Sequence, residues 1–309
     1  MADSVVVPGV WSLLAAALLV GLTCYAAGLN AALKAPGNPA QTFLVAPWAE
    51  TARLVRQRRR GTLAADTLLL RVGVTGMFAA ALLMIAVVPL GRWTLFDLDV
   101  GVVWFNAMDV MVWALVWLVG WGPNSVHSLI GGYRFLAQAL GYELPLMFAL
   151  VAPAIAAESL NLGTVAAAQQ ELWFVVWMPV AFLVYCVGVV AFSVSGPFRA
   201  ARGADIAGGV TAELSGADRL LFEGGRYALL AAGAAFAVPM FLGGGAGPWL
   251  PDWLWTIVKT VALLSVLVWV KHRIPTLRPD KFTEVGWLLL LPAVMLQDLV
   301  VAVIAVWRG

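Results

Sequence analysis

The chain has 309 residues, of which 62% are hydrophobic and 12% are charged. Soluble domains carry about 25% charged residues, so this composition excludes a soluble enzyme and a disordered chain. The formal net charge of +2 gives no support for nucleic-acid binding. Because the apolar runs are continuous rather than alternating, the sequence predicts an all-α membrane protein and not a β-barrel.

The apolar runs predict eight transmembrane helices in a single membrane domain covering residues 1–309. A surface amphipathic helix is expected over residues 43–60, where apolar side chains precede a basic run at residues 56–60. A transmembrane helix needs about 20 apolar residues, and the candidate spans are residues 10–29, 69–90, 101–120, 136–157, 172–194, 220–243, 252–270 and 285–307.

Basic residues gather in every second loop between these spans. The loops after the first, third, fifth and seventh spans hold Lys34, Arg53, Arg56, Arg58, Arg59, Arg60, His127, Arg134, Arg199, Arg202, Arg219, Lys271, Arg273, Arg278 and Lys281. The alternate loops hold only Arg92. The positive-inside rule therefore predicts that the basic loops are cytoplasmic and that both termini lie outside. Residues 1–9 lack the basic start of a signal peptide, and we expect a multi-pass protein of the bacterial plasma membrane.

Several ionisable residues fall within the predicted spans, where each costs several kcal/mol unless it is paired or hydrated. Asp109, Glu143 and Glu223 are the expected members of a proton path. The alternative for Glu223 is a self-neutralising pair with Arg226, three residues later on the same helix face. Lys259 and Asp298 also lie within predicted spans. For each of them, a polar contact between helices is as good an interpretation as a place in the proton path.

Two other classes of site find little support. The sequence contains no recognisable self-contained catalytic motif. Its two histidines and two cysteines are too few for a typical zinc or iron–sulfur site, so we expect no metal, and we interpret Cys24 and Cys186 as packing residues. A solute transporter would often show two similar halves, and no such symmetry is evident.

Residues 120–143 read GWGPNSVHSLIGGYRFLAQALGYE. This stretch resembles the third cytoplasmic segment of the H subunit of respiratory complex I, the NADH-quinone oxidoreductase. The resemblance extends over about residues 65–305, and further matching positions are Gln169, Gln170, Trp173, Pro197, Phe198, Glu213, Ser215, Gly216, Tyr227, Arg278, Asp280, Gly286 and Trp287.

The resemblance implies eight spans with both termini outside and a subunit that has no turnover alone. Such a subunit forms the membrane side of a shared quinone site and couples redox chemistry to proton transfer. Glu143 would be a proton-path carboxylate, and Arg134 with Gln138 would organise the polar entrance. Glu213, Arg278 and Asp280 would lie at the junction with the redox arm. The implied partners are that hydrophilic arm, antiporter-like membrane subunits and lipid.

The chain departs from the family where carboxylates are expected. Arg199 replaces the aspartate of a Pro-Phe-Asp motif, and Arg226 replaces a glutamate, although Glu223 lies one turn earlier and could substitute for it. Three interpretations remain open: a subunit of a quinone-linked complex, the related subunit of an energy-converting hydrogenase or formate hydrogenlyase, and a non-catalytic scaffold for a redox module.

Overall fold

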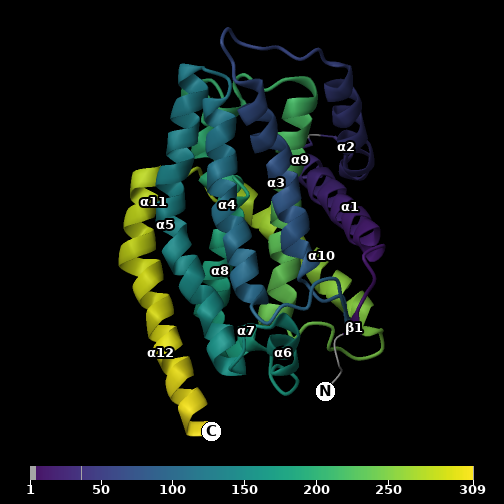
Figure 1. The fold of residues 1–309 in the computed structure, drawn as a ribbon, viewed down its shortest axis with the longest axis vertical. Coiled ribbons are helices and arrows are strands. Elements are labelled where there is room, and N and C mark those ends of the chain that lie inside the picture. Colours follow the sequence, from purple (N-terminus) through teal and green to yellow (C-terminus); the bar gives the residue numbers. More distant parts are fainter. Residues whose placement is uncertain (1–4, 36, 309) are drawn as a thin grey trace.

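The computed structural model describes residues 5–35 and 37–308. It is a bundle of long helices that run side by side (Figure 1). The long elements are α1 (Trp11–Ala32), α3 (Thr67–Ala86), α4 (Gly101–Trp121), α5 (Val126–Ala157), α8 (Pro179–Phe192), α9 (Gly216–Phe241), α10 (Asp252–Arg273) and α12 (Leu291–Arg308). Residues 1–4, which belong to the segment considered above for a signal peptide, lie outside the described residues.

The remaining elements connect these helices. They are α2 (Pro39–Arg56), α6 (Leu162–Ala167), α7 (Phe174–Trp177), α11 (Pro279–Val285), the π-helical turn η5 (Gly286–Leu290), and the 3-10 turns η1 (Gly196–Phe198), η2 (Ala200–Arg202), η3 (Ala204–Ile206) and η4 (Gly209–Thr211). Strands β1 (Val5–Val6) and β2 (Trp93–Thr94) form one small parallel pair, with Val5 opposite Trp93 and Val6 opposite Thr94. The predicted all-α class is therefore confirmed.

Seven helical stretches of the described chain are long and apolar enough to cross a membrane. They correspond to the predicted spans except residues 220–243, which lie in α9. The first half of α9 is polar and carries Glu223 and Arg226, whereas residues 228–241 are buried without interruption. A helix that is buried on every side lies inside a bundle rather than at its surface, so α9 occupies the centre.

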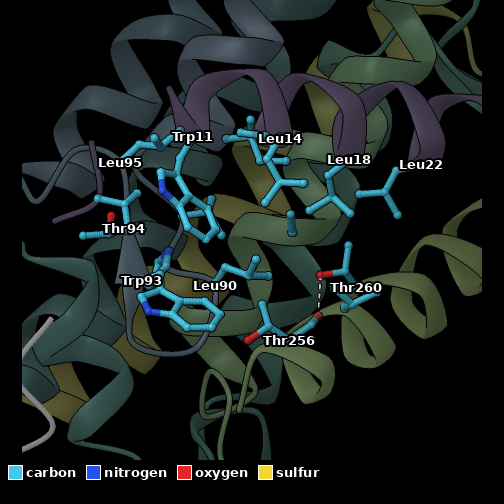
Figure 2. A pocket seen from close by; sticks show the side chains of 17 residues that line it. Trp11, Leu14, Leu18, Leu22, Leu90, Trp93, Thr94, Leu95, Thr256 and Thr260 are labelled. Atoms are coloured by element: carbon cyan, nitrogen blue, oxygen red, sulfur yellow. Dashed lines mark hydrogen bonds between the residues drawn. The ribbon is translucent and has the colours of Figure 1, made fainter. Parts of the chain in front are cut away.

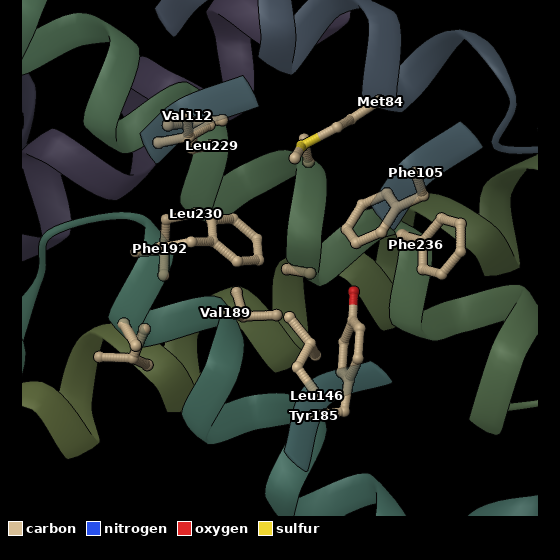
Figure 3. Packing of buried hydrophobic residues seen from close by; sticks show 14 of the residues in the cluster. Met84, Phe105, Val112, Leu146, Tyr185, Val189, Phe192, Leu229, Leu230 and Phe236 are labelled. Carbon is tan, nitrogen blue, oxygen red and sulfur yellow. The ribbon is translucent and has the colours of Figure 1, made fainter. Parts of the chain in front are cut away.

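The core around α9 is built from aromatic and aliphatic side chains (Figure 3). Phe105 of α4 stacks on Phe236 of α9 with 3.7 Å between ring centroids. The hydroxyl of Tyr185 in α8 donates a 2.7 Å hydrogen bond to the carbonyl of Gly233. The run of small residues at positions 231–235 of α9 allows neighbouring helices to approach closely, as in other membrane bundles.

Four predicted boundaries need correction. The amphipathic helix begins at Pro39, because Asn38 caps it by accepting hydrogen bonds from the next turn, and it ends at Arg56, so most of the basic run 56–60 is not helical. The span predicted at residues 136–157 belongs to a helix that starts at Val126, so His127 and Arg134 are helical rather than in a loop.

The other two corrections concern helix continuity. The span predicted at residues 172–194 is interrupted at Met178, because the residue before a proline disfavours helical backbone. The last helical stretch begins at Pro279 and includes the π-helical turn before α12.

The two ends of the bundle differ in what they carry. Helix α2 and the loop containing η1 to η4 lie at one end, and the β1–β2 pair, α6, α7 and the C-terminal end of α12 lie at the other (Figure 1). The first of these ends holds the basic segments at residues 53–60 and 199–202. We call it the basic end.

Candidate functional site

Two carboxyl groups predicted for the proton path are brought together between α4 and α5. Asp109 is completely buried, and Glu143 is 7% exposed. Their side chains are direct neighbours. The amide of Asn106, one turn before Asp109 on α4, donates a 3.4 Å hydrogen bond to Oε1 of Glu143. The structure therefore forms a carboxyl pair from residues that lie on different helices.

The carboxyl pair sits in a cluster of buried polar atoms that lack hydrogen-bond partners among the described residues. These atoms are both carboxyl oxygens of Asp109, Oε2 of Glu143, Oδ1 of Asn106, Nε1 of Trp113 and the hydroxyl of Tyr142. Burying such atoms unpaired costs about 1–3 kcal/mol each, and native proteins hold few of them. We call these five residues the carboxyl cluster.

Sequence reasoning missed Asn106 and Trp113 as members of the carboxyl cluster. A signal for them was present, because residues 106, 109 and 113 follow the i, i+3, i+7 spacing that places side chains on one helix face. Tyr142 belongs to the stretch at residues 120–143 that resembles the family. The rings of Trp113 and Tyr142 meet edge to face at 6.5 Å between centroids, so they form one wall beside the two carboxyls.

Arg134 and Gln138 precede the carboxyl pair on α5 but bind elsewhere. Arg134 Nη1 lies 2.7 Å from Oδ2 of Asp205 in η3. The hydrogen bond from Arg134 lowers the pKa of the Asp205 carboxyl below its ordinary value. The buried amide of Gln138 donates a 3.4 Å hydrogen bond to the carbonyl of Ala191 in α8. Arg134 thus joins α5 to the loop at the basic end, and Gln138 joins α5 to α8.

Glu223 belongs to a separate cluster on α9. Its Oε2 lies 2.6 Å from Nη1 of Arg226, and its Oε1 binds Arg202 of η2. The pairing of Glu223 with Arg226 expected from their spacing is confirmed, and Arg202 is a second partner that the sequence did not indicate. In the described chain no hydrogen bond or ion pair joins Glu223 to Asp109 or Glu143.

Arg226 also holds the end of α8. Its Nε and Nη2 donate hydrogen bonds of 3.1 and 2.6 Å to the carbonyl of Val194, whose backbone is left-handed with φ of +49°. A β-branched residue rarely adopts this conformation. The guanidinium therefore stabilises a strained chain reversal at the start of the loop that follows α8.

The surroundings of Glu223 are strongly cationic. Burial, together with the nearby charges of Arg199, Arg202 and Arg226, lowers the pKa of Lys34. The carboxylate of Glu223 thus shares this region with at least four cations. The net charge of the side chains around Glu223 is therefore positive.

The three residues predicted for the redox-arm junction lie near exposed surface or loops. Glu213 accepts a 2.9 Å hydrogen bond from the hydroxyl of Ser125. Arg278 and Asp280 bind each other at 3.0 Å and are largely exposed. Among the described residues, no hydrogen bond or ion pair links them to Arg134 or Gln138. A common quinone site for these five residues stays a prediction.

Lys259 is fully coordinated at the end of the bundle opposite the basic end. Its ammonium donates to the carbonyls of Leu242, Gly244 and Ala246 at 2.7, 2.8 and 2.8 Å. It also lies 4.2 Å from the ring centroid of Trp173. All three of its hydrogens have acceptors. Lys259 therefore joins α10 to the loop that follows α9, rather than to a second helix as the interpretation of an inter-helix contact expected.

Gln169, noted above only for its family resemblance, has a similar structural role. Its completely buried side chain donates to the carbonyls of Pro239 and Met240 at 2.7 and 3.2 Å, and it accepts from the amides of Phe174 and Gly243. It ties α6 and α7 to the end of α9.

Asp298 on α12 is 8% exposed, and neither carboxyl oxygen has a hydrogen-bond donor among the described residues. The adjacent Gln297 donates to the carbonyl of Trp177 at 2.9 Å and accepts from the amide of Ala181 at 3.0 Å. Gln297 thus bridges the break between α7 and α8, whereas Asp298 stays without an assigned role.

The fold and the buried carboxyl cluster define a multi-pass helical membrane protein with ionisable groups in its interior. A family model described as NADH dehydrogenase matches residues 9–302. The chain belongs to this family, whose curated members include the H subunit of NADH-quinone oxidoreductase, a membrane component of complex I.

Individual relatives cover most of the chain. The NADH-quinone oxidoreductase H subunit 1 of Geobacter metallireducens is 32% identical over 286 residues, which cover 89% of this chain and 87% of the relative. The H subunit 2 of Geobacter sulfurreducens is 32% identical, covering 86% of this chain and 84% of the relative. The H subunit 2 of Syntrophobacter fumaroxidans is 30% identical, covering 89% and 86%. The resemblance first seen in residues 120–143 is confirmed.

Proposed function

We propose that this chain is the membrane subunit of a proton-translocating NADH-quinone oxidoreductase in a bacterial plasma membrane. It forms the membrane side of the quinone site and couples redox chemistry to proton transfer, with no activity alone. In this proposal α9 is the eighth transmembrane helix, the basic end is cytoplasmic and both termini lie outside. The charge asymmetry of the loops and the central, buried position of α9 support this topology.

The carboxyl cluster is the observation that carries the proposed coupling role. Asp109 and Glu143 are neighbours, and two carboxylates repel when both are ionised. A change in the charge of one side chain therefore alters the proton affinity of the other. The unpaired polar atoms around them are groups to which water can bond. Water bound at these atoms carries the proton between the two buried carboxyls.

Glu223 stands apart from this pair in the proposed mechanism. Because it is held by Arg202 and Arg226, the charge of its cluster responds to redox chemistry at the basic end, while Asp109 and Glu143 carry the proton. Gln138, which lies between Arg134 and the carboxyl pair on α5, joins the two regions. Arg134, Gln138, Glu213, Arg278 and Asp280 are proposed to shape the quinone entrance and the contact with the hydrophilic redox arm.

The first experiment replaces each carboxyl of the pair in the assembled complex. Glu143→Gln and Asp109→Asn are expected to abolish proton translocation while the complex still assembles. Glu158→Gln is the matched control, because Glu158 follows the same helix but is exposed at the end of α5. Normal translocation by Glu143→Gln would contradict the coupling role and would favour a scaffold.

The cationic surroundings of Glu223 favour a second candidate, the corresponding subunit of an energy-converting hydrogenase or formate hydrogenlyase. There the acid-rich loop of a quinone site would not be required. Affinity purification in mild detergent, followed by mass spectrometry and a quinone-reductase assay, separates the two. Antiporter-like subunits with inhibitor-sensitive quinone reduction support the first proposal. A nickel-containing partner without quinone reduction supports the second.

A further inference from the structure

A pocket lies between α1, α10 and the loop around β2 (Figure 2). The strand pair to which β2 belongs lies at the end of the bundle opposite the basic end (Figure 1). The pocket is a partly open recess lined by 17 residues, of which all but three threonines are apolar. Trp11, Leu14 and Leu18 line it from α1, and Ile257 and Thr260 line it from α10. None of the proposed proton-path or quinone-site residues contributes to it.

The interior of this pocket suits a hydrocarbon chain. No charged side chain of the described residues lines it. Its three threonine hydroxyls already donate to backbone carbonyls: Thr94 to Phe96 at 3.3 Å, Thr256 to Asp252 at 3.1 Å, and Thr260 to Thr256 at 2.8 Å. A polar head group placed inside would find no free hydroxyl donor, and it would lose its hydration there. The occupant therefore presents apolar atoms to the interior.

The border of the pocket is polar. The rings of Trp11 and Trp93 lie 5.9 Å apart, and in the described part of the chain neither indole N–H donates a hydrogen bond. Tryptophan is enriched at the level of lipid head groups, where its ring is buried and its N–H is hydrated. Leu14 is 51% exposed, so the pocket wall formed by α1 is accessible from outside the bundle.

Arg92 supplies a cation beside this border. Its guanidinium lies 5.8 Å from the centroid of the Trp93 ring. The side chain is exposed, and within residues 5–35 and 37–308 it forms no ion pair. In the sequence, the loops after the second, fourth and sixth predicted spans contain no Lys or Arg other than Arg92. An arginine at this level attracts a lipid phosphate.

We propose that the pocket holds one acyl chain of a membrane phospholipid, whose phosphate contacts Arg92 and whose ester groups lie level with Trp11 and Trp93. The apolar interior matches the acyl chain, the two indole N–H groups match the ester groups, and the Arg92 cation at the rim matches the phosphate. A quinone with its tail in the pocket would leave Arg92 without an anion. This site is independent of the redox role proposed above.

The test measures the phospholipid that stays with the purified complex after extensive exchange into mild detergent, by lipid extraction and mass spectrometry. The wild type is expected to retain phospholipid in a fixed ratio to this chain. Leu18→Trp fills the pocket and should remove that lipid. Leu13→Trp is the matched control, because Leu13 is 73% exposed on the same helix and does not line the pocket. If Leu18→Trp fails to assemble, Ile257→Trp fills the pocket from α10.

A second pair of variants tests the head group. Arg92→Gln should lower phospholipid retention about fivefold, the effect of one interfacial cation. Arg71→Gln, at an exposed position on α3, should leave retention unchanged. Equal retention by wild type and by the filled pocket would overturn the proposal. So would unchanged retention by Arg92→Gln, or a retained species that is quinone rather than phospholipid.

Discussion

Replacement of Lys259 by methionine removes a buried ammonium while keeping an unbranched side chain of similar length. The change deletes three hydrogen bonds of 2.7–2.8 Å to carbonyls of the loop that follows α9 and the contact with the Trp173 ring. Each carbonyl left without a donor costs about 1–3 kcal/mol. The local chain can relax, and the desolvation cost of the ammonium disappears. We therefore expect a net loss of roughly 3–5 kcal/mol.

Unfolding of the detergent-purified protein by SDS titration or heat measures this loss. Lys281→Met is the matched control, because Lys281 pairs with Glu284 on the surface at 2.8 Å with 69% of its side chain exposed, and no measurable change is expected there. Lys259→Arg keeps the charge but cannot direct three donors from one atom, so its stability should fall between the two. The reasoning is refuted if Lys259→Met is as resistant as Lys281→Met.

Three further substitutions test other contacts. Arg226→Gln leaves the left-handed chain reversal after α8 without its guanidinium and should destabilise the protein by about 3 kcal/mol, measured by the same unfolding titration. Asp205→Asn removes the Arg134 pair. Because that pair lowers the Asp205 pKa, its stabilisation is present above the ordinary value of about 3.9 and is lost as pH falls further. The melting temperatures of the wild type and this variant should thus differ at pH 7 and converge in acid. Gly286→Ala places a methyl group against the Gly141 carbonyl and should lower the melting temperature, and an unchanged value would contradict the close approach of η5 and α5.

The sequence by itself determined the class of protein, the positions of most helices and the family. These features depend on local properties. A run of apolar residues stays in the membrane whatever its neighbours are, and the motif at residues 120–143 keeps its order in any fold. The same local information also limited the boundaries. Hydropathy alone could not place the start of α2, which the cap at Asn38 sets, or the start of α8, which the break before Pro179 sets.

Only the tertiary structure decided which ionisable residues are partners. Asp109 and Glu143 are 34 positions apart and become neighbours because α4 and α5 pack with these faces together. Glu223 instead binds Arg202, which is brought to it by the loop after α8. Lys259 meets three carbonyls of another segment. Sequence shows that a charged group lies in a span, but the rotation of each helix and the path of each loop set the contacts that determine what the group does.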